Sequence, residues 1–244
     1  MANFPVFQDL QFKDLSLAFE NDQVLFNDVN VQLPLEEIAW IRGASGEGKS
    51  QLLKIMTGLL MPTRGDFSIN GQGVGQMSFS EMLPYRLKMG YSFDYGGLLA
   101  NRTIHQNLSL PLMYHKIFSE DDVNQRVHAM LERFLLSDAA DLRPSEVTGG
   151  SRKAACVARA FLADPEMVLL DEPTIGLRAE AQTILADLIL EQRQRGTLKH
   201  VYVASANDAF MEPLATKVIE ISNKKLVCKP SVGVVAPLRK VAEG

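Results

Sequence analysis

The sequence contains few cysteines and no long apolar run, and both absences limit what the protein can be. Its 244 residues include two cysteines, Cys156 and Cys228, whose separation fits neither a metal-binding nor a redox pair. We therefore expect a cytosolic protein without disulfides. No apolar stretch approaches the roughly 18–20 residues of a membrane-spanning helix, and no basic segment followed by an apolar one opens the chain. We expect neither a signal peptide nor a transmembrane segment, although the protein could dock onto a partner that spans a membrane.

An excess of positive charge is also missing. Lysine and arginine number 25 against 29 aspartate and glutamate residues, which gives a formal net charge of −4. Because proteins that bind nucleic acid usually carry a basic surface, the charge gives no support to a nucleic-acid partner. Hydrophobic residues, in contrast, make up 46% of the chain and charged residues 22%. This composition is typical of a folded chain with a sizeable core, organised as one large α/β domain or as a core with a subdomain.

The most informative stretch is a glycine-rich segment with the spacing G-x-x-x-x-G-K-S at residues 43–50. It lies between an apolar run at 38–41 and a segment of helical periodicity at 51–60, which is the strand–loop–helix context of a phosphate-binding P-loop. In such a loop the glycines let backbone N–H groups surround phosphate oxygens, and the helix N-terminus adds a favourable dipole. The alternative is a chance match in a glycine-rich turn. The candidate nucleotide-binding residues here are Gly43, Ala44, Ser45, Gly46, Glu47, Gly48, Lys49, Ser50 and Gln51.

Two residues of this loop have specific expected roles. Lys49 would reach the β- and γ-phosphates of a nucleotide, and Ser50 would bind Mg²⁺ through its hydroxyl. A second candidate site follows the apolar run 167–170, which reads as a buried parallel strand and ends in Asp171 and Glu172. Because side chains alternate along a strand, one carboxylate can serve Mg²⁺ while the other faces the γ-phosphate and an attacking water. The alternative is a pair of solvated acids at a strand end.

The rest of the chain alternates between strand and helix patterns. The expected strands are at 15–19, 26–33, 66–69, 89–93, 201–204, 218–222 and 226–227. The expected helical regions are about 103–134, 152–162 and 179–195. Ser119 and Asp122 resemble a capping box inside the first region, whereas residues 72–88 show no clear period. A Gly-Gly pair at 149–150 opens the second region, where backbone N–H groups could meet another anion; an ordinary flexible loop is the alternative. From Lys229 onward we expect an irregular extension.

The order of these elements resembles the ATPase domain of ATP-binding-cassette (ABC) proteins. The resemblance implies an α/β fold of the P-loop NTPase type, with a RecA-like core, an N-terminal antiparallel β subdomain and an inserted α-helical subdomain. The expected boundaries are 1–228 for the single ATPase domain, 1–93 and 158–228 for its core, 94–157 for the helical subdomain and 229–244 for a C-terminal extension. In this family, ATP and Mg²⁺ bind between two head-to-tail subunits, each of which presents a signature motif to the nucleotide of the other.

The signature motif, usually Leu-Ser-Gly-Gly-Gln, here reads Val-Thr-Gly-Gly-Ser. The resemblance implies that Thr148, Gly149 and Gly150 contact the nucleotide held by the opposing subunit. It also implies that Glu172, at the end of what looks like the Walker B strand, polarises the attacking water. Phe19 reads as a core aromatic from its position alone, but it falls where the family stacks an aromatic ring on adenine.

Three positions depart from the family pattern. Asp94 replaces a glutamine at the join of core and helical subdomain, Ala206 replaces the switch histidine, and Arg178 replaces an aspartate that couples the two sites. A carboxylate at Asp94 could still hold Mg²⁺, so the expected metal ligands are Ser50, Asp94 and Asp171. Because losing one donor to the transition state typically costs about 10²–10³ in rate, we expect ATP and Mg²⁺ to bind but hydrolysis at this P-loop to be slow or absent.

Segments 93–98 and 107–112 look like those of importer-type and lipid-transport cassettes, with the Mla/MCE type nearest. The resemblance therefore implies a peripheral subunit on the cytoplasmic face of the inner membrane, with an integral-membrane permease and a second ABC ATPase subunit as partners. Two functions stay open: a motor subunit that drives the permease, or a regulatory cassette that lends its signature motif to an intact ATPase. A soluble cassette acting on DNA or ribosomes is less expected, because 244 residues leave no room for the extensions such proteins carry.

Overall fold

The computed structural model of the chain describes residues 5–19, 23–94, 97–115 and 118–231. Its centre is a six-stranded sheet with the strand order β10-β9-β3-β8-β7-β6. Strands β9, β3, β8, β7 and β6 run parallel, and β10 pairs antiparallel with β9. The strands are β3 (Ile38–Arg42), β6 (Met89–Ser92), β7 (Met167–Asp171), β8 (His200–Ala204), β9 (Lys217–Ser222) and β10 (Lys225–Pro230). The parallel strands bring their carboxyl ends to one edge, which is where sheets of this type bind ligands.

A second, antiparallel sheet has the strand order β2-β1-β4-β5. Its strands are β1 (Leu10–Ala18), β2 (Val24–Gln32), β4 (Arg64–Ile69) and β5 (Gln72–Gly73). In β1 the pairing with β2 shifts between Phe12 and Leu15, where Asp14 adopts a left-handed backbone with φ of 48°. This bulge adds one residue, so that Phe12 before it and Leu15 after it both face the core. The antiparallel sheet predicted ahead of the glycine-rich loop is confirmed.

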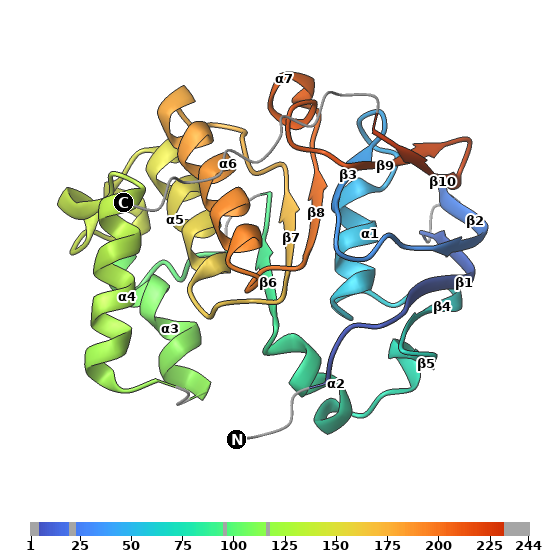
Figure 1. Ribbon diagram of the computed structural model, residues 1–244, viewed down its shortest axis with the longest axis horizontal. Helices are drawn as coiled ribbons and strands as arrows, with labels where there is room; N and C mark the ends of the chain where they lie inside the picture. Colours follow the sequence, from blue (N-terminus) through green and yellow to red (C-terminus); the bar gives the residue numbers. More distant parts are fainter. Residues whose placement is uncertain (1–4, 20–22, 95–96, 116–117, 232–244) are drawn as a thin grey trace.

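Helices connect the strands and cover both faces of the central sheet (Figure 1). They are α1 (Lys49–Met56), α2 (Phe79–Arg86), α3 (Ile104–His115), α4 (Glu120–Arg133), α5 (Gly149–Phe161), α6 (Ala179–Gln194) and α7 (Asp208–Met211), with short 3₁₀ turns at 74–76, 137–139 and 144–146. Ser119 caps α4 as predicted, since its hydroxyl accepts a hydrogen bond of 3.2 Å from the backbone N–H of Asp122. Within the described residues, no helix combines the length and the apolar character that crossing a membrane requires.

Helix α1 lies between the two sheets (Figure 1). Its apolar side chains Leu52, Leu53, Ile55 and Met56 are buried in one cluster with residues of both sheets. Fully burying such a side chain contributes about 1.5–3 kcal/mol, so the packing of α1 is a substantial part of this core. It also fixes the position of the helix start, where the glycine-rich loop ends.

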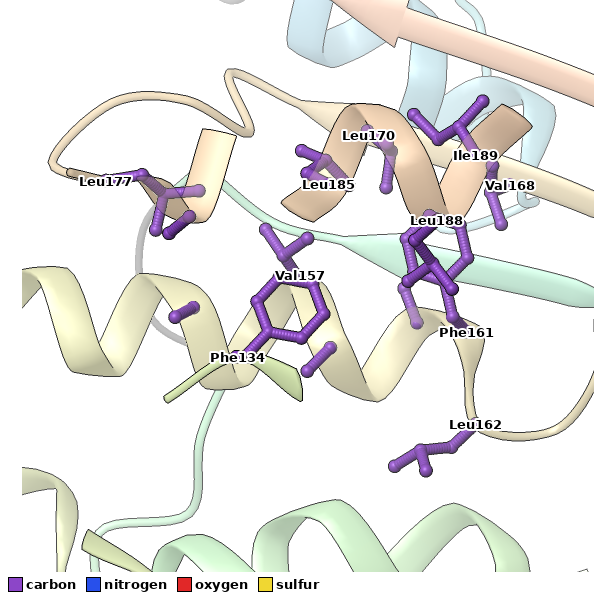
Figure 2. Close-up of a cluster of buried hydrophobic side chains, with 14 of the residues drawn as sticks. Phe134, Val157, Phe161, Leu162, Val168, Leu170, Leu177, Leu185, Leu188 and Ile189 are labelled. Atoms are coloured by element: carbon purple, nitrogen blue, oxygen red, sulfur yellow. The ribbon is translucent and has the colours of Figure 1, made fainter. Parts of the chain in front are cut away.

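A separate apolar cluster packs α5 and α6 against the opposite face of the sheet (Figure 2). Val157 and Phe161 of α5 meet side chains of α6 such as Leu188, and Val168 and Leu170 of β7 join them. Helix α5 is therefore held directly against the strand that ends in the two predicted acids. Its first two residues are the Gly-Gly pair, so this packing also places that pair.

Two parts of the fold differ from the sequence-based expectation. Residues 79–86 form α2, although no helical period is visible there; Ser78 and Glu81 build a complete capping box that starts the helix. Strand β10 runs to Pro230, two residues into the segment expected to be irregular, and residues 232–244 lie outside the described residues. The subdomain boundaries stay a prediction, and α5 continues across the proposed boundary at 157.

Candidate functional site

The candidate site lies at the carboxyl ends of β3, β7 and β8. The loop 43–48 follows β3, Asp171 ends β7 and Glu172 follows it, and residues 205–206 follow β8. These strands are neighbours in the sheet, with the order β3-β8-β7. Residues far apart in the sequence are thus brought together by parallel pairing.

The glycine-rich loop has the strained backbone that a P-loop needs. Gly48, which precedes α1, has φ of 97°, and a Cβ atom at this position would lie 2.8 Å from the ring of Phe26. Glycine is therefore required on both conformational and steric grounds. Within the loop, the Glu47 carboxylate accepts a 2.7 Å hydrogen bond from the backbone N–H of Ala44. The loop is held in shape at the N-terminus of α1, where backbone N–H groups favour an anion such as phosphate.

Lys49 is directed back over this loop. Its ammonium donates hydrogen bonds to the carbonyl oxygens of Gly43 at 2.9 Å and Ala44 at 3.2 Å. It also lies 3.9 Å from Oε1 of Glu172. The lysine of the loop and the second acid of β7 therefore face one space, which is what binding of a terminal phosphate beside an attacking water requires.

Ser50 and Asp171 come together as their predicted shared role requires. The Ser50 hydroxyl donates a 2.9 Å hydrogen bond to Oδ1 of Asp171. Asp171 is 2% exposed, and burial raises the pKa of its carboxyl above the usual range, opposed by the Ser50 hydrogen bond. A hydroxyl and a carboxylate are hard oxygen donors of the kind that Mg²⁺ prefers. These two residues therefore fit a magnesium ion.

Glu172 has an unusual backbone. Its φ of 41° places a residue other than glycine in the left-handed region, and its N–H donates to the carbonyl of Ala204 at 2.8 Å. One carboxylate oxygen, Oε2, accepts a 3.1 Å hydrogen bond from the backbone N–H of Ala206. Such strain is typical of functional positions. The other carboxylate oxygen, Oε1, is the one that lies 3.9 Å from Lys49.

Asp94, the third predicted metal ligand, has a partner that sequence reasoning missed. The ammonium of Lys153 lies 3.8 Å from Oδ1 of Asp94 and donates hydrogen bonds of 3.0 Å to the carbonyl oxygens of Phe93, Asp94 and Asp171. Among the described residues, no group of three or more histidine, cysteine, aspartate or glutamate side chains is arranged to hold a metal. The role of Asp94 as a magnesium ligand stays a prediction. The available signal was a lysine directly before the apolar stretch 154–158 of α5.

The predicted signature residues form a separate surface. Thr148 accepts a 3.1 Å hydrogen bond from the backbone N–H of Ser151 and so caps α5. Gly150 packs so closely on the carbonyl of Gly176 that a Cβ atom would lie 2.7 Å from it. Thr148, Gly150 and Arg178 line one pocket, and none of the residues 43–51 lines it. This separation is what a motif directed at a second subunit's nucleotide needs.

Phe19 is 40% exposed just after β1. Its proposed stacking on adenine stays a prediction, as do the contacts of Gln51 and Ser45 with a nucleotide. Tyr95 and Gly96, which follow Asp94 in the sequence, lie outside the described residues.

The sheet order, the loop before α1 and the acids after β7 define a P-loop nucleoside-triphosphate-binding protein. A family model described as "ABC transporter" matches residues 26–175, and the chain belongs to this family as an ATP-binding protein. It is 32% identical over 195 residues to the intermembrane phospholipid transport system ATP-binding protein MlaF of Haemophilus influenzae, covering 80% of this chain and 74% of that one.

Other relatives carry different names. The chain is 31% identical over 203 residues to the methionine import ATP-binding protein MetN of Latilactobacillus sakei, covering 82% of this chain. It spans only 59% of the length of that relative. It is also 34% identical over 168 residues to the lipoprotein-releasing system ATP-binding protein LolD of Buchnera aphidicola, covering 68% of this chain and 73% of that protein.

Solved structures agree on the fold. The dimeric post-hydrolysis state of the ATP-binding cassette MJ0796, bound to ADP and Pi, superposes with a TM-score of 0.83 at 23% identity, covering 92% of this chain and 99% of that one. An ATP-binding subunit of an ABC transporter gives a TM-score of 0.78 at 25% identity, covering 91% and 90% of the two chains. The predicted fold class, α/β of the P-loop NTPase type, is confirmed.

Proposed function

We propose that this chain is the ATP-binding subunit of a membrane ABC transporter. It binds ATP with Mg²⁺ at its own P-loop, pairs with a second ABC subunit across that nucleotide, and couples to a separate permease on the cytoplasmic face of the inner membrane. The observation that carries the proposal is the convergence of Lys49, Ser50, Asp171 and Glu172 at one edge of the sheet. The pocket of Thr148 and Gly150, which excludes the P-loop residues, supports a dimeric arrangement.

Hydrolysis at this P-loop is proposed to be slow. Glu172 is the residue proposed to polarise a water. Its carboxylate accepts a hydrogen bond from the backbone N–H of Ala206, whose methyl side chain offers no donor to the γ-phosphate. A missing donor of this kind typically costs about 10²–10³ in rate. Arg178 in place of the coupling aspartate is a second departure. Nucleotide binding depends instead on the loop backbone and Lys49, which are intact.

Lipid or a related molecule is the proposed cargo. The support is the likeness of segments 93–98 and 107–112 to lipid-transport cassettes, together with relatives named for phospholipid and lipoprotein systems. The methionine-import relative has similar identity, so the names of the relatives do not select the cargo alone. A permease subunit would carry the residues that choose it.

A second candidate function is favoured by the contrast between the two halves of the site. Thr148 keeps the hydroxyl of the signature motif and both glycines remain, while Ala206 and Arg178 have replaced groups that serve hydrolysis and coupling. Such a chain would act as a regulatory cassette, binding ATP itself and completing the active site of an intact ABC ATPase.

The first test is nucleotide binding and single-turnover hydrolysis by the purified chain. We expect saturable binding of labelled ATP with Mg²⁺ and very slow cleavage. Absence of saturable binding would overturn the whole proposal, and brisk cleavage would overturn the slow-hydrolysis part. Purification from detergent-solubilised membranes then separates the two functions: an accompanying permease with only this cassette supports the motor, and a second, intact cassette supports the regulatory role.

A further inference from the structure

Lys153 is a buried ammonium beside the proposed magnesium site. It lies in the second turn of α5, is 7% exposed, and donates hydrogen bonds of 3.0 Å to the carbonyl oxygens of Phe93, Asp94 and Asp171. An ammonium group has three donors and no acceptor. These three carbonyls therefore use all of its hydrogen-bonding capacity.

The surrounding charges offset part of the effect of burial. The Asp94 carboxylate lies 3.8 Å away, and the negative charges of Asp94, Asp171 and Glu172 all favour the protonated lysine. Burial acts in the opposite direction and lowers the pKa of Lys153. A buried charge persists only where hydrogen bonds and opposite charge replace its hydration. The site around Lys153 supplies both.

The three carbonyls belong to two neighbouring strands. Phe93 and Asp94 follow β6, and Asp171 is the last residue of β7. Strands β6 and β7 pair in parallel up to Ser92 and Leu170, so Lys153 bridges the two chain segments where their pairing ends. It attaches both to α5.

The contact with Asp171 is the one that concerns the nucleotide site. Lys153 holds the backbone carbonyl of Asp171, while the side chain of the same residue accepts the hydrogen bond from Ser50. Holding the backbone restricts where the carboxylate can lie. Groups that orient a metal ligand in this way typically change metal affinity about 10–100-fold when they are removed.

We propose that Lys153 is a positioning residue for the magnesium ligand Asp171, and that Asp94 serves as the counter-ion of Lys153. This inference deepens the proposed function and rests on it, because it assumes that Ser50 and Asp171 hold magnesium. Under this proposal Asp94 acts as a counter-ion and not as a direct metal ligand. Lys153 touches neither nucleotide nor metal; it acts through the backbone of Asp171.

The test is the magnesium dependence of ATP binding in Lys153→Met, which keeps the length of the side chain and removes its donors and charge. A fluorescent ATP analogue is titrated with and without Mg²⁺, and Mg²⁺ is titrated at fixed nucleotide. We expect the Mg²⁺ concentration that gives half of the maximal increase in nucleotide binding to rise about 10-fold or more. The affinity for the nucleotide in EDTA should change less than about 3-fold. Lys199→Met is the matched control, because Lys199 pairs with Glu166 at the amino end of β8.

A merely structural role gives a different result. General loosening of α5 would weaken binding equally with and without Mg²⁺, and this outcome overturns the proposal, as does an unchanged magnesium dependence in a folded variant. If Lys153→Met fails to fold, Lys153→Gln, which retains two donors, is used in the same titrations. A wild-type chain that binds no ATP would instead refute the proposed function and is recognised before any variant is made.

Asp94→Asn separates the two parts proposed for Asp94. As a counter-ion, Asp94 matters only while Lys153 is charged, so Asp94→Asn should weaken magnesium-dependent binding in the wild type and have little effect in the Lys153→Met background. If Asp94 bound magnesium directly, Asp94→Asn would weaken magnesium-dependent binding by the same factor in both backgrounds. Such additive effects would overturn the assignment of Asp94 as a counter-ion. Thermal unfolding of each variant confirms that folded protein is compared.

Discussion

The backbone N–H of Ala206 donates a 3.1 Å hydrogen bond to Oε2 of Glu172. A side chain at position 206 therefore begins next to the carboxylate that we propose polarises the attacking water. Glu172 also lies 3.9 Å from the ammonium of Lys49 through its other oxygen. The side chain at position 206, two residues after the end of β8, would thus lie beside the carboxylate proposed to act on the γ-phosphate.

We predict that Ala206→His increases ATP hydrolysis. An imidazole at this position would add a donor to the developing charge on the γ-phosphate, and such donors typically contribute about 10²-fold or more in rate. Single-turnover cleavage of radiolabelled ATP measures the change, and Ala206→Leu controls for added bulk without a donor. An unchanged rate would shift the cause of slow hydrolysis to Asp94 or to the dimer interface.

Lys49→Ala should weaken nucleotide binding severely. The substitution removes the ammonium that bonds Gly43 and Ala44 and that would bind the β- and γ-phosphates. Losing one charge-assisted interaction of about 1.5–3 kcal/mol corresponds to a Kd increase of about 10–100-fold. Equilibrium binding of a fluorescent nucleotide provides the measurement, with Lys13→Ala on the exposed side of β1 as the control. A Kd within two-fold of the wild type would contradict the phosphate-binding role of the loop.

Glu172→Gln should separate binding from cleavage. The amide keeps the shape of the side chain but cannot accept a proton from water, and general-base residues typically contribute about 10²–10⁴ in rate. We expect residual hydrolysis to fall by about 10² while ATP affinity stays within about three-fold. Glu132→Gln, at an exposed position near the end of α4, is the control. Equal cleavage by Glu172→Gln and wild type would show that the residual activity does not use this carboxylate.

His200 should make the fold sensitive to acid. It is 1% exposed, its Nδ1 accepts a hydrogen bond from the backbone N–H of Glu36, and burial lowers its pKa from 6.5 to about 4, while nearby Glu166 opposes the shift. Between these two values the unfolded chain binds a proton that the folded chain does not, so the free energy of unfolding decreases as the pH falls through that window. The loss is about 3 kcal/mol in total.

Urea unfolding from pH 7.5 to pH 4 measures this dependence. His200→Asn keeps an acceptor for Glu36 but cannot titrate, so its stability should vary less over the window than that of the wild type. The control is His128→Asn, at an exposed position on α4. If wild type and His200→Asn lose stability in parallel, the acid sensitivity originates elsewhere.

Local sequence was sufficient for the parts of the site that are continuous in the chain. The spacing of Gly43 to Ser50 indicated the loop and the helix that follows, and the apolar run before Asp171 indicated a buried strand. Both are short motifs whose geometry depends on neighbouring residues. The pairing of Ser50 with Asp171 followed because parallel strands end at the same edge.

Contacts between distant segments were not predictable in the same way. Lys153 donates a hydrogen bond to the carbonyl of Phe93, which lies 60 positions earlier in the sequence. The local pattern of apolar and polar residues does not indicate which carbonyl oxygens a buried lysine will contact. The left-handed backbone of Glu172 depends on its hydrogen bond to Ala204 in the next strand. Helix α2 is too short and too polar for its period to stand out, although Ser78 and Glu81 are recognisable as a capping box once the helix is known.

The hydrogen bond between Ser50 and Asp171 has a consequence for how a cation would enter. The Ser50 hydroxyl donates a hydrogen bond to Oδ1 of Asp171 at 2.9 Å. The two side chains proposed to bind magnesium would therefore already be close together when an ion arrives. If Ser50 and Asp171 hold magnesium as proposed, the ion would replace this one hydrogen bond with oxygen ligands from both side chains. The two side chains proposed to hold the ion are therefore already paired in the protein without it.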